Sequence, residues 1–223
     1  MPWLLFRKSA ILLVFFLTYI ERVKMSKTTS VIICGPSGVG KGTIIKSILQ
    51  RYKGKVALSV SHTTRKPRAG EINGIHYHFV AKEAMQLGIS QNLFLEHATV
   101  HGNMYGTSKQ AVETIIKSGR VCLLDLDVNG VKQMKIIEYP AKFIFIAPPS
   151  IDILESRLRN RATETEENIL LRLKNAAAEI EYGVGENNFD VVITNNDLEE
   201  SVTCITNKIN EWCGFILQQQ AQL

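Results

Sequence analysis

Apolar residues gather into short runs along the chain, separated by segments in which they recur every three to four positions. The runs Ser30–Cys34, Arg120–Asp127 and Lys142–Ala147 are almost continuously apolar and predict buried strands, and Val56–Val60 and Val191–Ile193 predict shorter ones. The periodic segments predict helices at Lys41–Tyr52, Lys109–Lys117, Ile151–Asn160, Glu166–Tyr182 and Leu198–Leu217. Apolar strands that alternate with helices are typical of an α/β fold, in which helices cover both faces of a parallel sheet.

The stretch 61–108 interrupts this order. It contains short strand-like runs at His76–Val80 and Phe94–Val100, with glycine-containing turns around them. This pattern predicts a small mixed β insert within the larger domain. A chain of 223 residues with 45% hydrophobic residues suits one domain of this class, which we place at residues 25–223.

Residues 1–24 differ from the rest of the chain. Ala10–Ile20 is a nearly unbroken apolar run with charged residues on both sides. A membrane-spanning helix needs about 20 apolar residues, so this run has the length of a signal-peptide core, yet no small-residue cleavage site follows it. Three interpretations stay open: a targeting leader, a weak membrane anchor, or upstream sequence outside a functional protein that begins at Met25.

The charge balance is weakly basic. The chain has 26 Lys and Arg residues against 21 Asp and Glu residues, a net charge of +5. Arg7, Lys8, Arg22 and Lys24 stand against Glu21 in the leader, so +3 lies there and +2 remains for residues 25–223. No continuous basic block or RNA-binding motif occurs in the body of the chain. We therefore expect no nucleic-acid partner, and no stable membrane association.

The cysteines Cys34, Cys122, Cys204 and Cys213 form no C-x-x-C pair, zinc pattern or disulfide framework. Reduced and mostly buried thiols are the expectation for such spacing. A cytoplasmic location fits this composition, and targeting to an organelle through residues 1–24 is the alternative.

A glycine-rich segment, Gly35–Lys41 (GPSGVGK), lies between the first predicted strand and the first predicted helix. In this context G-x-x-x-x-G-K is a phosphate loop: the glycines let successive N–H groups point at phosphate oxygens, the helix N-terminus adds its positive dipole end, and the lysine reaches the terminal phosphates. Gly42 stands where the motif usually has Ser or Thr, so position 42 offers no hydroxyl to Mg²⁺. The residues expected to bind ATP are Gly35, Pro36, Ser37, Gly38, Val39, Gly40, Lys41, Gly42 and Thr43.

Two further clusters point to phosphate chemistry. Asp125 and Asp127 end a predicted strand on one face, where carboxylates can organise Mg²⁺ through water or hold a ligand. We assign Mg²⁺, carried with ATP, as the cofactor and Asp125 as its water-mediated ligand. Arg65 and Arg68 begin the insert and are spaced to converge on one anion. A second arginine-lined site indicates that the acceptor is also a phosphate compound.

With these motifs the sequence closely resembles the guanylate kinase family. The resemblance covers nearly all of residues 30–200 in the family's order. It implies a phosphate-loop kinase core, an insert at about 61–108 that binds the nucleoside monophosphate, and a helical lid at about 155–175. The matching segments are Gly35–Thr43 (GPSGVGKGT), Ser59–Glu71 (SVSHTTRKPRAGE), Asn73–Phe79 (NGIHYHF), Phe94–Glu96 (FLE), Gly102–Thr107 (GNMYGT), Cys122–Asp127, Phe145–Pro149 (FIAPP) and Arg161–Arg172 (RATETEENILLR).

The resemblance also implies how GMP is held. Four residues match the family's clamp on the GMP phosphate: Arg65, Arg68, Tyr77 and Tyr105. Glu96 matches the carboxylate that accepts hydrogen bonds from N1 and N2 of guanine. The hydroxyls at the guanine edge are Ser61 and Thr107, where the family usually has serine at the second position. Asp127 completes the GMP-binding set.

Arginines in the lid are implied to close over the transferring phosphoryl group. The catalytic set is Lys41, Arg65, Arg157, Arg161 and Arg172, and Asn195 lies where the chain returns to ATP. The implied reaction phosphorylates GMP, and dGMP, with ATP in purine nucleotide metabolism, by a monomer or a homodimer. Three alternatives stay open: a non-catalytic guanylate kinase-like interaction domain, another nucleotide kinase such as an adenylate kinase, and a membrane-tethered adaptor.

Overall fold

The computed structural model describes residues 28–100, 102–160 and 165–219. Within them, five parallel strands form the core sheet, in the order β2-β7-β1-β8-β9. Their bounds are β1 (Ser30–Cys34), β2 (Val56–Leu58), β7 (Val121–Leu126), β8 (Lys142–Ala147) and β9 (Val191–Thr194). The predicted parallel sheet is therefore confirmed, and β2 is shorter than the predicted Val56–Val60.

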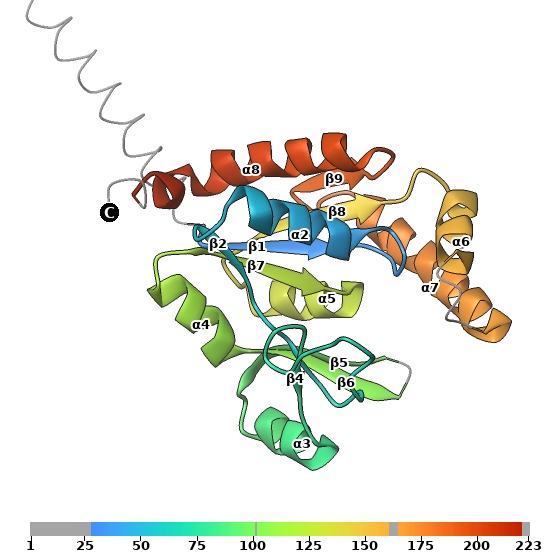
Figure 1. The fold of residues 1–223 in the computed structure, drawn as a ribbon, viewed down its shortest axis with the longest axis horizontal. Coiled ribbons are helices and arrows are strands. Elements are labelled where there is room, and N and C mark those ends of the chain that lie inside the picture. Colours follow the sequence, from blue (N-terminus) through green and yellow to red (C-terminus); the bar gives the residue numbers. More distant parts are fainter. Residues whose placement is uncertain (1–27, 101, 161–164, 220–223) are drawn as a thin grey trace, which may run out of the picture.

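Helices cover both faces of this sheet, as predicted. Figure 1 shows α2 and α8 on one side of the strands and α4 and α5 on the other. The helices around the core sheet are α2 (Lys41–Arg51), α4 (Lys109–Lys117), α5 (Val128–Ile136), α6 (Ile151–Arg159), α7 (Glu166–Val184) and α8 (Leu198–Gln219). In β1 the side chains alternate between two apolar clusters: Val31 and Ile33 pack toward α2 and α8, and Ile32 and Cys34 pack toward α4 and α5.

The insert forms a second, four-stranded sheet with the order β4-β3-β6-β5. Its elements are β3 (His62–Thr63), β4 (His78–Phe79), α3 (Lys82–Ser90), β5 (Phe94–Val100) and β6 (Asn103–Ser108). The β3–β4 pair is parallel and the other pairs are antiparallel, which confirms the prediction of a mixed sheet. Figure 1 shows the insert below the core sheet, with α3 at its far end.

Two helices are absent from the predicted set. α5 contains Asn129–Gly130, a pair typical of turns, but the Asp127 carboxylate caps this helix by accepting a hydrogen bond from the Gly130 N–H at 2.7 Å. α3 contains Gly88, where a Cβ atom would lie 2.8 Å from the Phe94 ring. A glycine therefore lets α3 approach β5 closely, although glycine disfavours helices in isolation.

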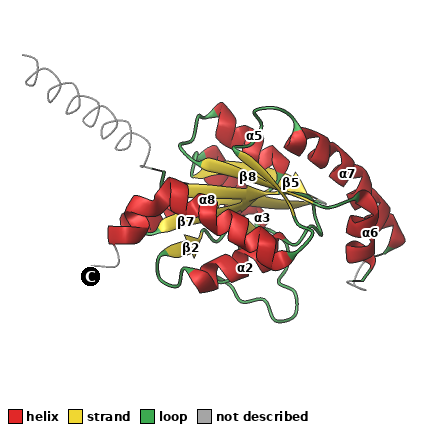
Figure 2. Ribbon diagram, turned by 90° about the horizontal axis from the view of Figure 1, so that it is seen from above, coloured by secondary structure: helices red, strands yellow, loops and turns green. Residues whose placement is uncertain are grey.

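The carboxyl ends of β1, β7 and β8 meet at one edge of the core sheet, with β1 in the middle. The glycine-rich loop follows β1, and Asp125 and Asp127 lie at the end of β7. In open parallel sheets, ligands bind in the crevice at this edge. Seen from above in Figure 2, α6 and α7 lie beyond the same edge of the sheet.

The cysteine prediction is confirmed: Cys34, Cys122 and Cys213 are buried, Cys204 is exposed, and all four are free thiols. None of the helices in the described ranges combines the length and the apolar character that a membrane span requires. The leader, residues 1–24, lies outside the described residues.

Candidate active site

A cavity of about 400 Å³ lies between the glycine-rich loop and the insert. Residues of the core and of the insert line it, so the loop after β1 and the arginines of the insert face one space. The predicted site residues that line it are Gly35, Pro36, Ser37, Gly38, Gly40, Lys41, Gly42, Ser61, Arg65, Arg68, Tyr77, Glu96, Tyr105, Asp125, Asp127 and Arg172.

The loop has the backbone that a phosphate site needs. Gly38 and Gly40 have φ angles of 91° and 104°, in the left-handed region that favours glycine. At Gly40 a Cβ atom would also lie 2.6 Å from the Asn195 amide nitrogen, so a side chain does not fit there. The loop ends at the N-terminus of α2, where backbone N–H groups are available to an anion.

Two positive side chains reach the loop from different elements. The Lys41 ammonium donates a hydrogen bond to the Gly35 carbonyl at 2.5 Å. Arg172, on α7, donates from Nη1 to the Ser37 hydroxyl at 2.6 Å. Both groups line the cavity, so positive charge borders the loop on two sides.

Asn195 and Arg157 hold the same loop from behind. The buried Asn195 amide donates to the Val39 carbonyl at 2.7 Å and accepts from the Ser201 hydroxyl at 3.1 Å. Arg157 donates to the Asn195 carbonyl at 3.0 Å and to the Val39 carbonyl at 3.4 Å. Neither residue is among those that line the cavity. Both therefore contact the loop backbone, where the resemblance implied contacts with ATP and with the transferring phosphoryl group.

Three other predicted residues also lie away from the cavity lining. Val39 is fully buried, and Thr43 is exposed on α2. Thr107 is buried in β6, opposite Glu96 of β5. Arg161, one of the predicted lid arginines, lies outside the described residues.

Carboxylates form the floor of the cavity near Lys41. Asp125 is open to the cavity, and Glu179 reaches it from α7 beside Asp127. Burial raises the pKa of both Asp125 and Glu179. The positive charge of Lys41 opposes this rise, and the negative charge of Asp127 adds to it. The acidic floor thus faces the one lysine of the loop.

Glu96 has the least exposed carboxylate of the cavity. It is 6% exposed, and burial, with Asp127 adding to the effect, raises its pKa to about 7. Its Oε2 atom packs against the start of α5, because a Cβ atom at Gly130 would lie 2.9 Å from it. The adjacent Thr107 interacts with this carboxylate through its hydroxyl and its backbone, which opposes the rise in the pKa. A buried carboxylate beside a buried hydroxyl at the cavity suits a ligand that offers donors.

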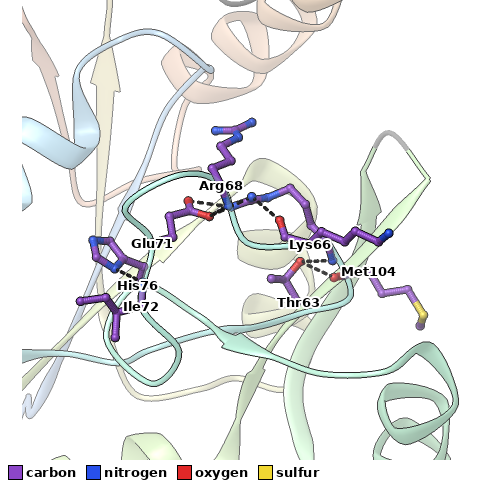
Figure 3. A network of polar contacts seen from close by, with 8 residues as sticks. Thr63, Lys66, Arg68, Glu71, Ile72, His76 and Met104 are labelled. Carbon is purple, nitrogen blue, oxygen red and sulfur yellow. Dashed lines mark hydrogen bonds and ion pairs between the residues drawn. The ribbon is translucent and has the colours of Figure 1, made fainter.

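Arg65 is held by an acidic partner at the mouth of the insert. Its guanidinium forms two parallel hydrogen bonds to Glu71, at 2.8 and 2.9 Å, and stacks near the Tyr77 ring at 5.4 Å. Tyr77 and Tyr105 pack edge to face at 6.0 Å. Figure 3 shows Glu71 and Arg68 side by side in this network. Arg65, Arg68 and the two tyrosines therefore converge on one end of the cavity, as predicted.

Sequence reasoning gave no role to three residues of this region, Glu71, Asn175 and Glu179. Asn175 and Glu179 line the cavity together with Arg172. The spacing 172, 175, 179 places them on one face of a helix, and this spacing is a signal by which they could have been found. Glu71 lies within the quoted segment Ser59–Glu71, but only the folded loop brings it to Arg65.

Among the described residues, no group of three or more His, Cys, Asp or Glu side chains could hold a metal ion by itself. Asp125 nevertheless offers an accessible carboxylate at the cavity floor, close to Lys41 and the loop. Hard oxygen ligands of this kind suit Mg²⁺, which commonly keeps several waters and binds through one or two carboxylates and substrate phosphates. The donor set therefore fits Mg²⁺ delivered with a nucleotide.

Comparisons with known proteins agree with this geometry. A family model described as guanylate kinase matches residues 27–211. "Guanylate kinase 1" of Arabidopsis thaliana is 49% identical over 170 residues, which are 76% of this chain and 44% of that protein. The "Guanylate kinase" of Homo sapiens is 44% identical over 187 residues, 84% of this chain and 95% of that protein. The match thus spans less than half of the plant protein and nearly all of the human one.

A solved structure is also similar to this fold. The crystal structure of guanylate kinase from Anaplasma phagocytophilum superposes with a TM-score of 0.62 at 33% sequence identity. The superposition covers 83% of this chain and 87% of that chain. Both the core sheet and the insert thus belong to a known arrangement.

Proposed function

The chain belongs to the guanylate kinase family, and from this premise we propose that it transfers the terminal phosphoryl group of ATP to GMP. The products are ADP and GDP, and dGMP is the alternative acceptor, giving dGDP. The observation that carries this proposal is one cavity bordered by a phosphate loop on one side and by an arginine pair with a buried carboxylate on the other. A kinase for a nucleoside monophosphate needs these two anion sites facing each other.

The ATP side of the proposal rests on the loop. Its backbone N–H groups and the start of α2 would cradle the phosphates, with Lys41 at the terminal ones. Arg172 borders the same space through its contact with Ser37. Asn195 and Arg157 would keep the loop in shape, given their hydrogen bonds to its backbone.

On the GMP side, Arg65 and Arg68 with Tyr77 and Tyr105 would bind the phosphate. Glu96 would accept from N1–H and N2–H₂ of guanine, which presents two adjacent donors at that edge. Its position next to the Thr107 hydroxyl supports this role, because both groups are buried and Glu96 lines the cavity. Adenine has a bare N1 acceptor at the same edge and would leave the carboxylate unpaired. Ser61 and Asp127 line the same cavity and would contribute to the binding of GMP.

The reaction would place little covalent demand on the protein. The attacking oxygen belongs to the GMP phosphate, which is anionic near neutral pH, so no strong general base is needed. Catalysis would then depend on alignment of the two nucleotides and on neutralising charge as it spreads over the transferred group. Lys41 and Arg172, which both line the cavity, would supply that charge. Arg65 keeps the acceptor phosphate in line.

Mg²⁺ carried by ATP would be held by the nucleotide phosphates, water and Asp125, and when bound it supplies further positive charge to the phosphates. Gly42 contributes no hydroxyl to it. Asp125 is therefore the protein group on which this part of the proposal depends.

A coupled ADP-release assay tests the function. We expect the full chain to release ADP with ATP and GMP, and to turn over AMP, CMP and UMP at least about 10³-fold less efficiently, the scale of discrimination seen when a buried polar group loses its partner. ADP release without any nucleoside monophosphate would indicate an ATPase instead. Equal turnover of AMP would indicate a different monophosphate kinase.

A further inference from the structure

One carboxylate outside the cavity lining holds two parts of the proposed GMP site. The Glu71 oxygens accept from Arg65 Nη1 at 2.9 Å and from Nη2 at 2.8 Å. The oxygen that meets Nη1 also accepts from the Arg68 backbone N–H at 2.7 Å. Figure 3 shows this carboxylate directed at the backbone of Arg68. Glu71 thus ties the guanidinium of one arginine to the main chain of the other.

The way Arg65 is bound leaves one edge of its guanidinium for another anion. A guanidinium carries five N–H donors in a fixed plane. Glu71 takes two of them at the Nη1/Nη2 end, and the Lys66 carbonyl takes a third, from Nη1, at 2.8 Å. The Nε–H and the second Nη2 hydrogen share the adjacent edge of the plane, and Glu71 does not occupy this edge. The cavity-lining Tyr105 hydroxyl interacts with the same guanidinium.

The side chains of this ion pair are less exposed than those of the other ion pairs among the described residues. The Arg65 and Glu71 side chains are 15% and 17% exposed. The Arg65 guanidinium also lies 5.4 Å from the Tyr77 ring and 5.8 Å from the Phe79 ring. The guanidinium holds the pKa of Glu71 at about 2, so the carboxylate is ionised at every pH at which the protein would work.

We propose that Glu71 is a positioning residue for the GMP phosphate, which orients the guanidinium of Arg65 and the backbone at Arg68 and does not itself contact the nucleotide. The proposal rests on the proposed role of Arg65. A long arginine side chain loses considerable rotamer freedom when it binds a ligand. Glu71 removes that freedom in advance and leaves the second edge of the fork for phosphate. A carboxylate that instead competed with the phosphate for Arg65 would have the opposite effect on affinity.

The test compares Glu71→Gln, Arg65→Lys and the double variant in the full chain. For each, kcat and the KM values of GMP and ATP are measured, together with the inhibition constant of guanosine, which has the base and no phosphate. Glu199→Gln is the control, because it makes the same change in an Arg–Glu ion pair, with Arg51, that does not line the cavity. Thermal unfolding is recorded for every variant.

We expect Glu71→Gln to raise the KM of GMP about tenfold. In metal sites, removing a residue that orients a metal ligand lowers affinity or activity by about 10–100-fold, and this is the lower end of that range. The KM of ATP, the guanosine constant and the control should stay within twofold of the parent. The double variant should bind GMP no more weakly than the worse single variant, because Glu71 acts through Arg65. A KM of GMP that is unchanged or lower in Glu71→Gln, or effects of the two changes that multiply, would overturn the proposal.

Three further outcomes are also decisive. If Glu71→Gln unfolds below the assay temperature, Glu71→Asp keeps the charge and shortens the reach, and the same criteria apply to it. If the parent does not phosphorylate GMP, the proposed function fails, and calorimetric binding of GMP and of guanosine still measures what Glu71 does. If Arg65→Lys alone leaves GMP affinity unchanged, the role of Arg65 is wrong and the proposal falls with it.

Discussion

The glycine-rich loop and the insert border one cavity, but they are held in shape by different means. The loop is made of backbone, and buried or half-buried side chains from distant elements fix it: Asn195 and Arg157 bind the Val39 carbonyl, and Arg172 binds Ser37. It follows β1, a strand whose five residues are all buried. The insert site is made of side chains, which come from the loops around the two-residue strands β3 and β4 and from the longer strands β5 and β6.

Because of this difference, the two halves of the site depend on different features of the protein. A backbone site survives most single substitutions around it, since its N–H groups are always present. A side-chain site depends on individual partners, such as Glu71 for Arg65 and the start of α5 for Glu96. It also responds to pH, because burial has moved the pKa of Glu96 to about 7. We therefore expect the loop to control turnover and the insert to control affinity, identity of the base and pH dependence.

Lys41→Ala should give the largest single effect and test the loop side. The Lys41 ammonium lines the cavity and is the charge nearest to the loop phosphates in this proposal. Removing a charge-neutralising group of this kind lowers phosphoryl transfer by roughly 10³–10⁵-fold. We expect kcat to fall on that scale, measured by ADP release, while GMP binding by calorimetry stays unchanged. Turnover within tenfold of the parent would mean that the loop does not act on the transferred phosphate.

Glu96→Gln should give the next largest effect and test the insert side. It keeps the size of the side chain and replaces one acceptor with a donor, which then faces a donor of guanine. We expect kcat/KM for GMP to fall by at least about tenfold, and the ratio of AMP to GMP efficiency to rise. Glu113→Gln, the same change on the surface of α4, is the control. If Glu96→Gln keeps the parent's preference, the base contact must be sought at Ser61, Thr107 or Asp127.

The ionisation of Glu96 predicts how GMP affinity varies with pH. With a pKa of about 7, the carboxyl is mostly protonated at pH 6 and mostly ionised at pH 8. Guanine needs the ionised form, so the KM of GMP should rise about tenfold from pH 8 to pH 6. The GMP phosphate also gains a proton near pH 6. The inhibition constant of guanosine therefore isolates the carboxyl, and it should lose its pH dependence in Glu96→Gln.

The raised pKa of Glu96 also predicts how the stability of the fold changes with pH. Because the pKa of Glu96 is higher in the folded state than its usual 4.5, the carboxyl stabilises the fold fully below pH 4.5 and loses this effect as pH rises through about 7. The free energy of unfolding of the parent, relative to Glu96→Gln, should therefore fall between pH 5 and pH 8. Urea denaturation at both pH values measures it. A difference independent of pH would place the pKa of Glu96 in its usual range.

The sequence predicted the loop half of the site because its signals are local. Ser30–Cys34, the glycines and Lys41–Arg51 follow one another directly, so strand, loop and helix could be identified from one segment. The alternation of Asp125 and Asp127 also put both carboxylates on the cavity side. In the insert, Arg65 and Arg68 were found as a pair of cations. The roles of Tyr77, Tyr105 and Glu96 came from family resemblance, since nothing in their spacing brings them together.

What the sequence did not predict depends on contacts between distant residues. Asn195 was expected to meet ATP, but its amide lies behind the loop, where it bonds a carbonyl 156 positions earlier in the chain. α5 was missed because its cap, Asp127, also suited a ligand role, and because Asn129–Gly130 favours a turn. No role was predicted for Glu71, because only the folded loop between β3 and β4 brings its carboxylate to the Arg65 guanidinium. Each of these contacts requires the tertiary fold.

Asn195→Ala should have a moderate effect, and it tests whether the loop depends on the hydrogen bond that Asn195 makes to its backbone. The change leaves the Val39 carbonyl and the Ser201 hydroxyl without this buried partner. We expect a loss of about 1–3 kcal/mol in stability, the cost of leaving buried polar groups unpaired, and a several-fold higher KM of ATP. The KM of GMP should not change. Asn196→Ala, at the exposed neighbouring position, is the control. Equal rises in both KM values would mean that loop and insert are not independent.

Gly42→Ser should have the smallest effect, and it asks whether the loop can accept a metal ligand that it lacks. Gly42 lines the cavity and lies within α2, and a Cβ atom there would meet nothing within 4 Å. Serine should therefore fold normally and gain about 0.5 kcal/mol in helix propensity. We expect the Mg²⁺ concentration for half-maximal rate to fall by about threefold, the scale of one added polar contact. Gly42→Ala also favours the helix, by about 0.8–1 kcal/mol, but adds no hydroxyl, so it should leave the Mg²⁺ dependence unchanged. If serine and alanine behave alike, the hydroxyl does not reach the metal, and Asp125 with water is sufficient to hold it on the protein side.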